Sequence, residues 1–258
     1  MKRSRFPFYV TLIVMLFLYV PIIILVINSF SESRFGGVLT GFSLKWYEKL
    51  FEERAMWHAL RNSLVIGVSA TVVSTVLGTT AALALYRYKT KLQKVHYGLI
   101  YTPLVIPDIL MGIALLLFFV LINLQLGLFT IFVAHTTFCM SYVTMVVLTR
   151  LQNFDYSIIE AAQDLGANAW TVFRRILFPL LAPGICAGAL LAFTLSIDDF
   201  VITFFVAGKG AITLPIYIYS MIKFGSTPII NALSCIMLLL TFAVVWFTKN
   251  ILIAEKSK

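Results

Sequence analysis

The sequence predicts an all-α membrane protein with six transmembrane helices. Of its 258 residues 60% are hydrophobic and 12% are charged, whereas a soluble chain carries about 25% charged residues. Apolar stretches of about 20 residues, the length of helix that crosses a ~30 Å hydrocarbon core, recur between polar or basic breaks. A β-barrel would show short segments of alternating hydrophobicity instead. Six segments fit a helical span: 8–29, 59–86, 96–122, 128–148, 180–207 and 230–251.

The first segment starts with basic residues and continues as an apolar run to Phe30. This run is longer than the apolar region of a signal peptide, and no small-residue cleavage site follows it. We therefore expect a retained anchor helix. With the external loop after it, the helix makes up a first region of residues 1–57, before a core at 58–250 and a cytoplasmic tail at 251–258.

The basic residues predict the orientation in the membrane. Most of the 20 Lys and Arg lie before the first span, between spans two and three, between spans four and five, and after the sixth. Positively charged loops stay in the cytoplasm, so we expect both termini there. The same bias accounts for the net charge of +9 without a nucleic-acid partner.

Two spans carry small residues at every fourth position, which places them on one helix face. Such stripes let helix backbones approach closely within a membrane. They are equally suited to a helix of this chain and to one of a second subunit. The stripes are Ala70, Ser74, Gly78 and Ala82 in the second span, and Gly184, Gly188, Ala192 and Ser196 in the fifth.

The third span contains Pro103 and Pro107, followed at once by Asp108. A proline removes a backbone donor and leaves a carbonyl of the preceding turn unpaired. We therefore expect a broken helix with acceptors that point into a cavity. Asp108 then either lines this cavity or caps the half-helix that follows.

The cytoplasmic segment between spans four and five predicts a helical hairpin. Ser157 and Glu160 form a capping box, which starts a helix, and Gly166 is suited to end it in the left-handed conformation. Asn168 or Thr171 can cap a second short helix before Pro179. Arg174 and Arg175 suit the negative C-terminal end of that second helix. These residues alone leave open whether the hairpin is a docking surface or a connector.

This hairpin resembles the EAA loop of ABC-importer permeases, with Phe178 replacing the usual Leu. The resemblance covers residues 58–250 and implies the type I, MetI-like permease fold. It also implies that the loop, about 150–178, is the coupling helix that docks on a cytoplasmic ATPase. The matching residues are Glu160, Ala161, Ala162, Gly166, Ile176 and Pro179, and Asp164 lies among them.

Other segments are similar to PotC-type permeases of spermidine/putrescine importers in the bacterial inner membrane. They are "YVPIIILVINSF", "ALYRY", "PDILMGIALL", "EAAQDLGA" and "SIDDFVITFFVAG". The resemblance implies a polyamine substrate and three kinds of partner. These are a homologous permease that completes a heterodimer, two ATPase subunits and an external substrate-binding protein.

The sequence contains no phosphate-binding loop of the G-x-x-x-x-G-K-[ST] type. We therefore expect no enzymatic activity and no cofactor in this chain, with ATP and Mg on the partner ATPase. Its three cysteines lie within spans without a close pair, which excludes a disulfide framework. His135 and Cys139 have a metal-ligand spacing, but no third ligand converges, so we expect no metal site.

Three carboxylates lie deep in predicted spans: Asp108, Asp198 and Asp199. A charge at mid-helix costs about 2.5–3.5 kcal/mol on insertion scales, so such residues face a polar cavity or a partner. No Lys or Arg is comparably deep, which makes an internal salt bridge an unfavoured explanation. Carboxylates without matching bases suit a cationic solute, and Tyr217 and Tyr219 can add cation–π contacts.

Adjacent helical residues point about 100° apart, so Asp198 and Asp199 face one path only if the backbone bends between them. The family resemblance favours Asp198 as the closer contact, with Asp199 as support. The alternatives are that one carboxylate is protonated by burial beside its neighbour, or that it sits at a wetted helix end.

Two functions of different classes fit these features. The first is the permease subunit of an ATP-driven polyamine importer, with permeases for other cations such as thiamine or ferric iron as its nearest rivals. The second is a free-standing, ion-coupled carrier. The EAA-like hairpin favours the first, because a carrier needs no ATPase dock.

Overall fold

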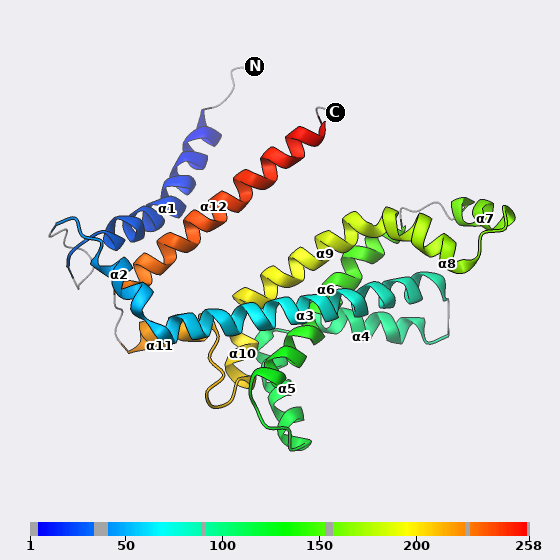
Figure 1. The fold of residues 1–258 in the computed structure, drawn as a ribbon, viewed down its shortest axis with the longest axis horizontal. Coiled ribbons are helices and arrows are strands. Elements are labelled where there is room, and N and C mark those ends of the chain that lie inside the picture. The colour runs from blue at the N-terminus through cyan, green and yellow to red at the C-terminus, as the bar shows by residue number, and fades with distance from the viewer. Residues whose placement is uncertain (1–4, 34–40, 89–90, 153–156, 225–227, 257–258) are drawn as a thin grey trace. The chain divides into compact units, whose positions relative to one another are not determined.

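A computed structural model describes residues 5–33, 41–88, 91–152, 157–224 and 228–256, with side chains as far as residue 242. In these ranges the regular structure is helical, apart from an isolated bridge between Ser31 and Phe42. The chain divides into two compact units, residues 1–57 with 218–258 and residues 58–217. Figure 1 shows the helices of both units.

The first unit contains α1 (Phe6–Ser29), α2 (Lys45–Glu52) and α12 (Ile229–Lys256). Helix α12 contacts both α1 and α2. Helix α1 exposes large apolar side chains along its length, as a helix does when it faces lipid. The short helix α2 buries Trp46 and Leu50, and the Trp46 indole N–H donates to the Ser31 carbonyl at 2.7 Å.

The second unit is built around α6 (Leu128–Gln152), the most buried of its long helices. Helices α3 (Arg54–Arg87) and α9 (Phe178–Asp198) lie against it through their small residues. A Cβ on Gly78 would lie 2.8 Å from the Met140 carbonyl oxygen, and one on Gly188 would lie 3.4 Å from the Val143 Cα. Both predicted stripes therefore face α6 of this chain.

The third predicted span is broken, as its prolines indicated. Helix α4 (Gln93–Val105) ends two residues before Pro107, and α5 (Asp108–Leu121) leaves at an angle of 113°. The fifth predicted span, 180–207, is also not one helix, because α9 ends at Asp198 and α10 (Val201–Val206) begins after an extended Asp199. The backbone thus bends at the two adjacent aspartates.

Helix α10 packs closely on α5 and α6. A Cβ on Gly112 of α5 would lie 2.7 Å from the Phe205 ring, and the Thr130 hydroxyl of α6 donates to the Val206 carbonyl at 2.7 Å. In Figure 1, α5 and α10 lie together at one end of α6, opposite the end that leads to α7 (Ser157–Asp164). The two helix breaks therefore meet on the same side of this unit.

The predicted hairpin is present, with one correction. Helix α7 ends at Asp164, close to Gly166 as expected; the φ of Gly166 is +85°, and the Ala167 N–H donates to the Ala162 carbonyl at 3.0 Å. Asn168 caps α8 (Ala169–Val172) by accepting the Thr171 N–H at 2.8 Å.

The expectation of a separate second helix before Pro179 was wrong. Helix α8 continues through a π-helical turn, η1 (Phe173–Leu177), into α9. Arg174 and Arg175 lie in this turn and not at a helix C-terminus. Pro179 follows this turn, and as a proline inside a continuous helix it removes one backbone donor there.

Four helices in the described ranges are long and apolar enough to cross a membrane, and the bent pair of α4 and α5 is long and apolar enough when counted as one span. The short helix α11 (Leu214–Lys223) leads towards α12. The count of six spans, the cytoplasmic termini and the boundaries of the three sequence regions stay predictions.

Candidate functional site

A cavity of about 280 Å³ lies where the α4–α5 break meets the α9–α10 break. Both breaks place a carboxylate there, because Asp108 opens α5 and Asp198 closes α9. The structure thus brings together all three carboxylates that the sequence singled out. The lining residues are Pro103, Asp108, Phe138, Tyr142, Thr194, Leu195, Asp198, Asp199, Phe200, Val201 and Ile202.

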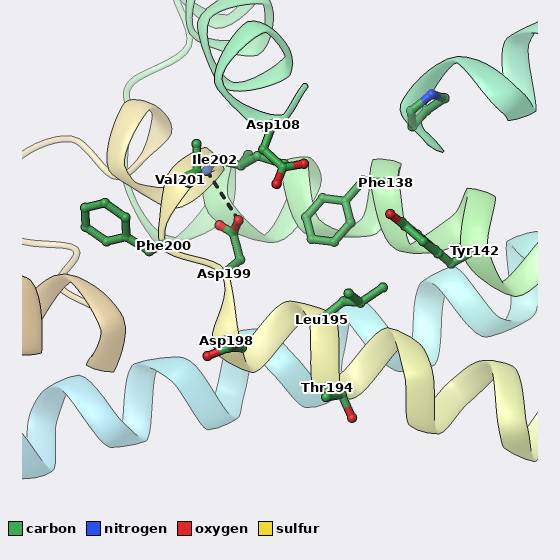
Figure 2. A pocket seen from close by; sticks show the side chains of 11 residues that line it. Asp108, Phe138, Tyr142, Thr194, Leu195, Asp198, Asp199, Phe200, Val201 and Ile202 are labelled. Atoms are coloured by element: carbon green, nitrogen blue, oxygen red, sulfur yellow. Dashed lines mark hydrogen bonds between the residues drawn. The ribbon is translucent and has the colours of Figure 1, made fainter. Parts of the chain in front are cut away.

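The three carboxylates differ in exposure and direction. Asp108 and Asp198 are exposed, whereas the side chain of Asp199 is only 9% exposed. In Figure 2 the carboxylates of Asp108 and Asp199 point towards the same space, while that of Asp198 points away from Phe138. The extended residue between the two half-helices explains why neighbours in sequence point in different directions.

Asp199 caps α10 with its side chain. Its Oδ1 accepts the Ile202 N–H at 3.3 Å, drawn as a dashed line in Figure 2. Its Oδ2 accepts the Thr203 N–H at 2.8 Å and the Thr203 hydroxyl at 2.7 Å. An acidic side chain in this position satisfies backbone donors that have no partner within the helix and complements the helix dipole.

The structure also pairs Asp199 with a base that sequence reasoning missed. His135 of α6 is 1% exposed, and its Nε2 lies 3.2 Å from the Asp199 Oδ2. Only Lys and Arg were considered as partners from the sequence, so this internal partner of Asp199 was not found. A polar ring at the centre of a span was the available signal, but its partners are 61 and 68 residues away in the chain.

His135 and Cys139 both serve helix packing. The ring nitrogens of His135 contact the Ser196 hydroxyl at 2.7 Å and the Thr203 hydroxyl at 2.9 Å. The Cys139 thiol donates to the Ala192 carbonyl at 3.4 Å. Their four-residue spacing thus reflects one face of α6 turned towards α9 and α10. The part of the chain that the structure describes contains no group of three His, Cys, Asp or Glu arranged to hold a metal ion.

The aromatic residues of the cavity are not the ones that the sequence favoured. Phe138 and Tyr142 from α6 and Phe200 from the break line it. Tyr217 belongs to α11 and is not a lining residue, and Tyr219 falls in the other unit. The 22 Phe and 11 Tyr of the chain give no sequence signal that distinguishes the lining aromatics.

A second surface lies at the hairpin of α7 and α8. Ile159 and Val172 are each 3% exposed and fix the hairpin to the second unit, whereas Glu160, Ala161, Asp164 and Gly166 are exposed. Leu165 at the turn is 90% exposed and Trp170 is 66% exposed. Ala162 and Ile176 are half-buried and Pro179 is exposed. The hairpin therefore presents acidic and apolar side chains together at the end of α6 and α9.

Comparisons with known proteins agree with this architecture. The chain is 41% identical over 242 residues to the spermidine/putrescine transport system permease protein PotC of Escherichia coli K12, covering 94% of this chain and 91% of the relative. It is 42% identical to PotC of Haemophilus influenzae, covering 94% and 93%. It is also 42% identical to the putrescine permease PotI of Escherichia coli K12, covering 92% and 86%.

Solved structures share the fold at lower identity. A bacterial ABC transporter involved in alginate import superposes with a TM-score of 0.71 at 16% identity, covering 97% of each chain. The MetNI methionine ABC transporter in an inward-facing conformation gives a TM-score of 0.64 at 19% identity, covering 77% of this chain and 96% of that one. This confirms the all-helical, MetI-like permease fold.

Residues 74–252 match the family model described as binding-protein-dependent transport system inner membrane component. The match covers more than half of the chain and includes α5, α6, α7, α9 and α10, which carry the cavity and the hairpin. The chain therefore belongs to the family of binding-protein-dependent transport system inner membrane components.

Proposed function

We propose that this chain is the permease subunit of an ATP-driven importer of polyamines, spermidine or putrescine. The observation that carries the proposal is the cavity that Asp108, Asp198 and Asp199 line at two helix breaks. The names of PotC and PotI support the same substrate class. Polyamines are polycations, so a group of carboxylates within the membrane compensates for the water that their ammonium groups lose.

Carboxylates provide the stronger contacts for the solute along its path, and aromatic side chains provide the weaker ones. Asp198 is the closer contact, with Asp199 as support, and Asp108 adds a third carboxylate. A charge-assisted hydrogen bond from an ammonium to a carboxylate contributes roughly 1.5–3 kcal/mol. Phe138 and Tyr142 offer aromatic faces within the cavity, and Tyr217 and Tyr219 remain proposed contacts further along the path. Each cation–π contact adds about 0.5–2 kcal/mol.

The hairpin of α7 and α8 transmits the energy of ATP hydrolysis. Its exposed acidic and apolar residues suit a groove on a cytoplasmic ATPase, and the coupling residues are Glu160, Ala161, Ala162, Asp164, Gly166, Ile176 and Pro179. Two ATPase subunits bind ATP and Mg, so this chain needs no cofactor and hydrolyses nothing itself. A homologous permease completes the path as a heterodimer, and an external binding protein delivers the solute.

Reconstitution tests this function. Proteoliposomes receive the chain, its partner permease and the ATPase, with ATP inside and the loaded binding protein outside. We expect uptake of labelled spermidine or putrescine that requires ATP and the binding protein. Thiamine and ferric iron are the competitors. Uptake of one of these cations without polyamine uptake would assign another substrate, and polyamine flux through liposomes with this chain alone would indicate a carrier.

A further inference from the structure

We propose that His135 is a positioning residue. It fixes Asp199 within the α9–α10 break, so that Asp108 and Asp198 are the carboxylates which the transported cation meets. This inference rests on the proposed function. It gives the two adjacent aspartates different roles, and it assigns a role to a buried ring that the transport path itself does not use.

The carboxylate of Asp199 accepts hydrogen bonds from donors of its own chain. A carboxylate offers about four lone-pair sites. Asp199 accepts from the Ile202 N–H, the Thr203 N–H and the Thr203 hydroxyl, and the His135 Nε2 lies 3.2 Å from its Oδ2. Three of these contacts fall on Oδ2, and the Ile202 N–H is the contact of Oδ1. Donors of the protein therefore hold the Asp199 carboxylate in place, whereas Asp108 and Asp198 are exposed residues.

The contacts of His135 fix which ring nitrogen carries the proton. Thr203 has one hydroxyl proton, and it goes to the Asp199 Oδ2. The Thr203 oxygen therefore accepts from the His135 Nε2, at 2.9 Å, and this nitrogen carries a proton that Asp199 shares. In the neutral ring, Nδ1 then accepts the Ser196 hydroxyl at 2.7 Å. One tautomer thus satisfies every contact.

The ring joins both sides of the break to α6. Ser196 lies in α9 before the break, Asp199 lies in it, and Thr203 lies in α10 after it. His135 contacts all three and is 1% exposed. Because Asp198 directly precedes Asp199, the direction of its carboxylate depends on the backbone geometry that His135 holds.

Two amide substitutions test the contacts of the two ring nitrogens of His135 separately. In His135→Gln the side-chain amide nitrogen can occupy the position of Nε2, which keeps a donor for Asp199 and loses the Ser196 contact. In His135→Asn the amide can occupy the position of Nδ1, which keeps Ser196 and leaves Asp199 without this donor. Thr137→Val is the matched control on α6, because the Thr137 hydroxyl donates to the Val133 carbonyl of its own helix.

The readout is initial spermidine uptake by the reconstituted complex, with ATPase turnover as the test of assembly. We expect His135→Gln and Thr137→Val to stay within about two-fold of wild type, and His135→Asn to fall roughly ten-fold, as the loss of a donor to a buried carboxylate implies. ATPase turnover should be retained in all three. Equal uptake by the Gln and Asn variants, or a lower rate for Gln, would overturn the assignment.

A double substitution tests whether His135 acts through Asp199. In an Asp199→Asn background, His135→Asn should reduce uptake by less than about two-fold, because its target has already lost its charge. A further loss as large as in the wild-type background would refute the positioning role. Failure of the wild-type complex to import any polyamine would instead refute the proposed function, so the two failures are distinguishable.

Discussion

Gly112 and Phe205 are in contact across two half-helices, and a Cβ on Gly112 would lie 2.7 Å from the Phe205 ring. Helices α5 and α10 therefore approach each other at a distance that only glycine permits. Of the cavity carboxylates, Asp108 lies at the start of α5, and Asp198 and Asp199 precede the start of α10. The contact thus fixes the distance between Asp108 at the start of α5 and the break that precedes α10.

Gly112→Ala is expected to lower uptake and thermal stability. Overpacking a close contact costs typically about 1–3 kcal/mol, and movement of α5 also displaces Asp108. Gly98→Ala is the control, since nothing lies within 4 Å of a Cβ at this helical position, and replacing a helical glycine favours the helix by roughly 0.5–1 kcal/mol. Melting curves of the purified complex and uptake rates check both variants. Equal behaviour of the two would contradict the close contact.

Asp108→Asn and Asp198→Asn are expected to reduce spermidine uptake at least several-fold. Each removes a charge-assisted bond of roughly 1.5–3 kcal/mol, which corresponds to ~10- to 150-fold in an equilibrium constant. Asp199→Asn should have a smaller effect on the first contact with the cation. Uptake is measured per permease in the membrane, with Glu52→Gln as a control at an exposed position of α2. Normal rates for both cavity variants would make these carboxylates structural.

The hairpin turn predicts a graded series at Gly166. Its φ of +85° favours glycine and tolerates asparagine, while a left-handed alanine costs roughly 1–2 kcal/mol. Proline also loses the N–H that donates to the Gln163 carbonyl at 2.8 Å. Uptake should therefore fall in the order Asn, Ala, Pro.

Co-purification with the ATPase shows whether a loss of uptake in this series comes from weaker docking. Glu160→Lys should also reduce co-purification, because it reverses a charge on the exposed face of α7. A Gly166→Pro variant that binds the ATPase and transports normally would contradict the docking role of the hairpin.

Tyr142 is the aromatic residue of the cavity whose ring and hydroxyl can be tested separately. Tyr142→Phe should retain uptake and Tyr142→Leu should lower it by about two- to thirty-fold, because a cation–π contact contributes about 0.5–2 kcal/mol. Tyr88→Leu serves as the control, since Tyr88 is 63% exposed at the end of α3 and does not line this cavity. A loss in Tyr142→Phe equal to that in Tyr142→Leu would assign the effect to the hydroxyl.

Features with a local physical cause could be read from the sequence. Pro103 and Pro107 predicted the broken third span because a proline acts on its own helix turn, and Gly166 predicted the end of α7 for the same reason. The small-residue stripes predicted close packing, although only the structure showed that α6 receives both of them.

Features that depend on distant pairs could not be read in this way. The role of the His135 ring depends on its contacts with Ser196 and Thr203, which lie 61 and 68 residues away in the chain. The continuation of α8 into α9 depends on a π-helical turn that contains Arg174 and Arg175, and no sequence pattern predicted this turn. The sequence did not distinguish Tyr142, because the chain contains many aromatic residues and buried aromatic side chains are common in membrane proteins.

The half-helix α5 also constrains how the protein is made. Its 14 residues extend about 21 Å at 1.5 Å per residue, less than a ~30 Å hydrocarbon core. Alone it is therefore too short to cross the bilayer, and it forms a bent pair with α4. Its glycine face is covered by α10, which the ribosome adds about 90 residues later, because Gly112 contacts Phe205. During synthesis this face and the backbone ends beside it therefore stay uncovered, in a solvent that cannot hydrogen-bond them. A chain stopped before Val201, the first residue of α10, should for this reason be a substrate for membrane proteases.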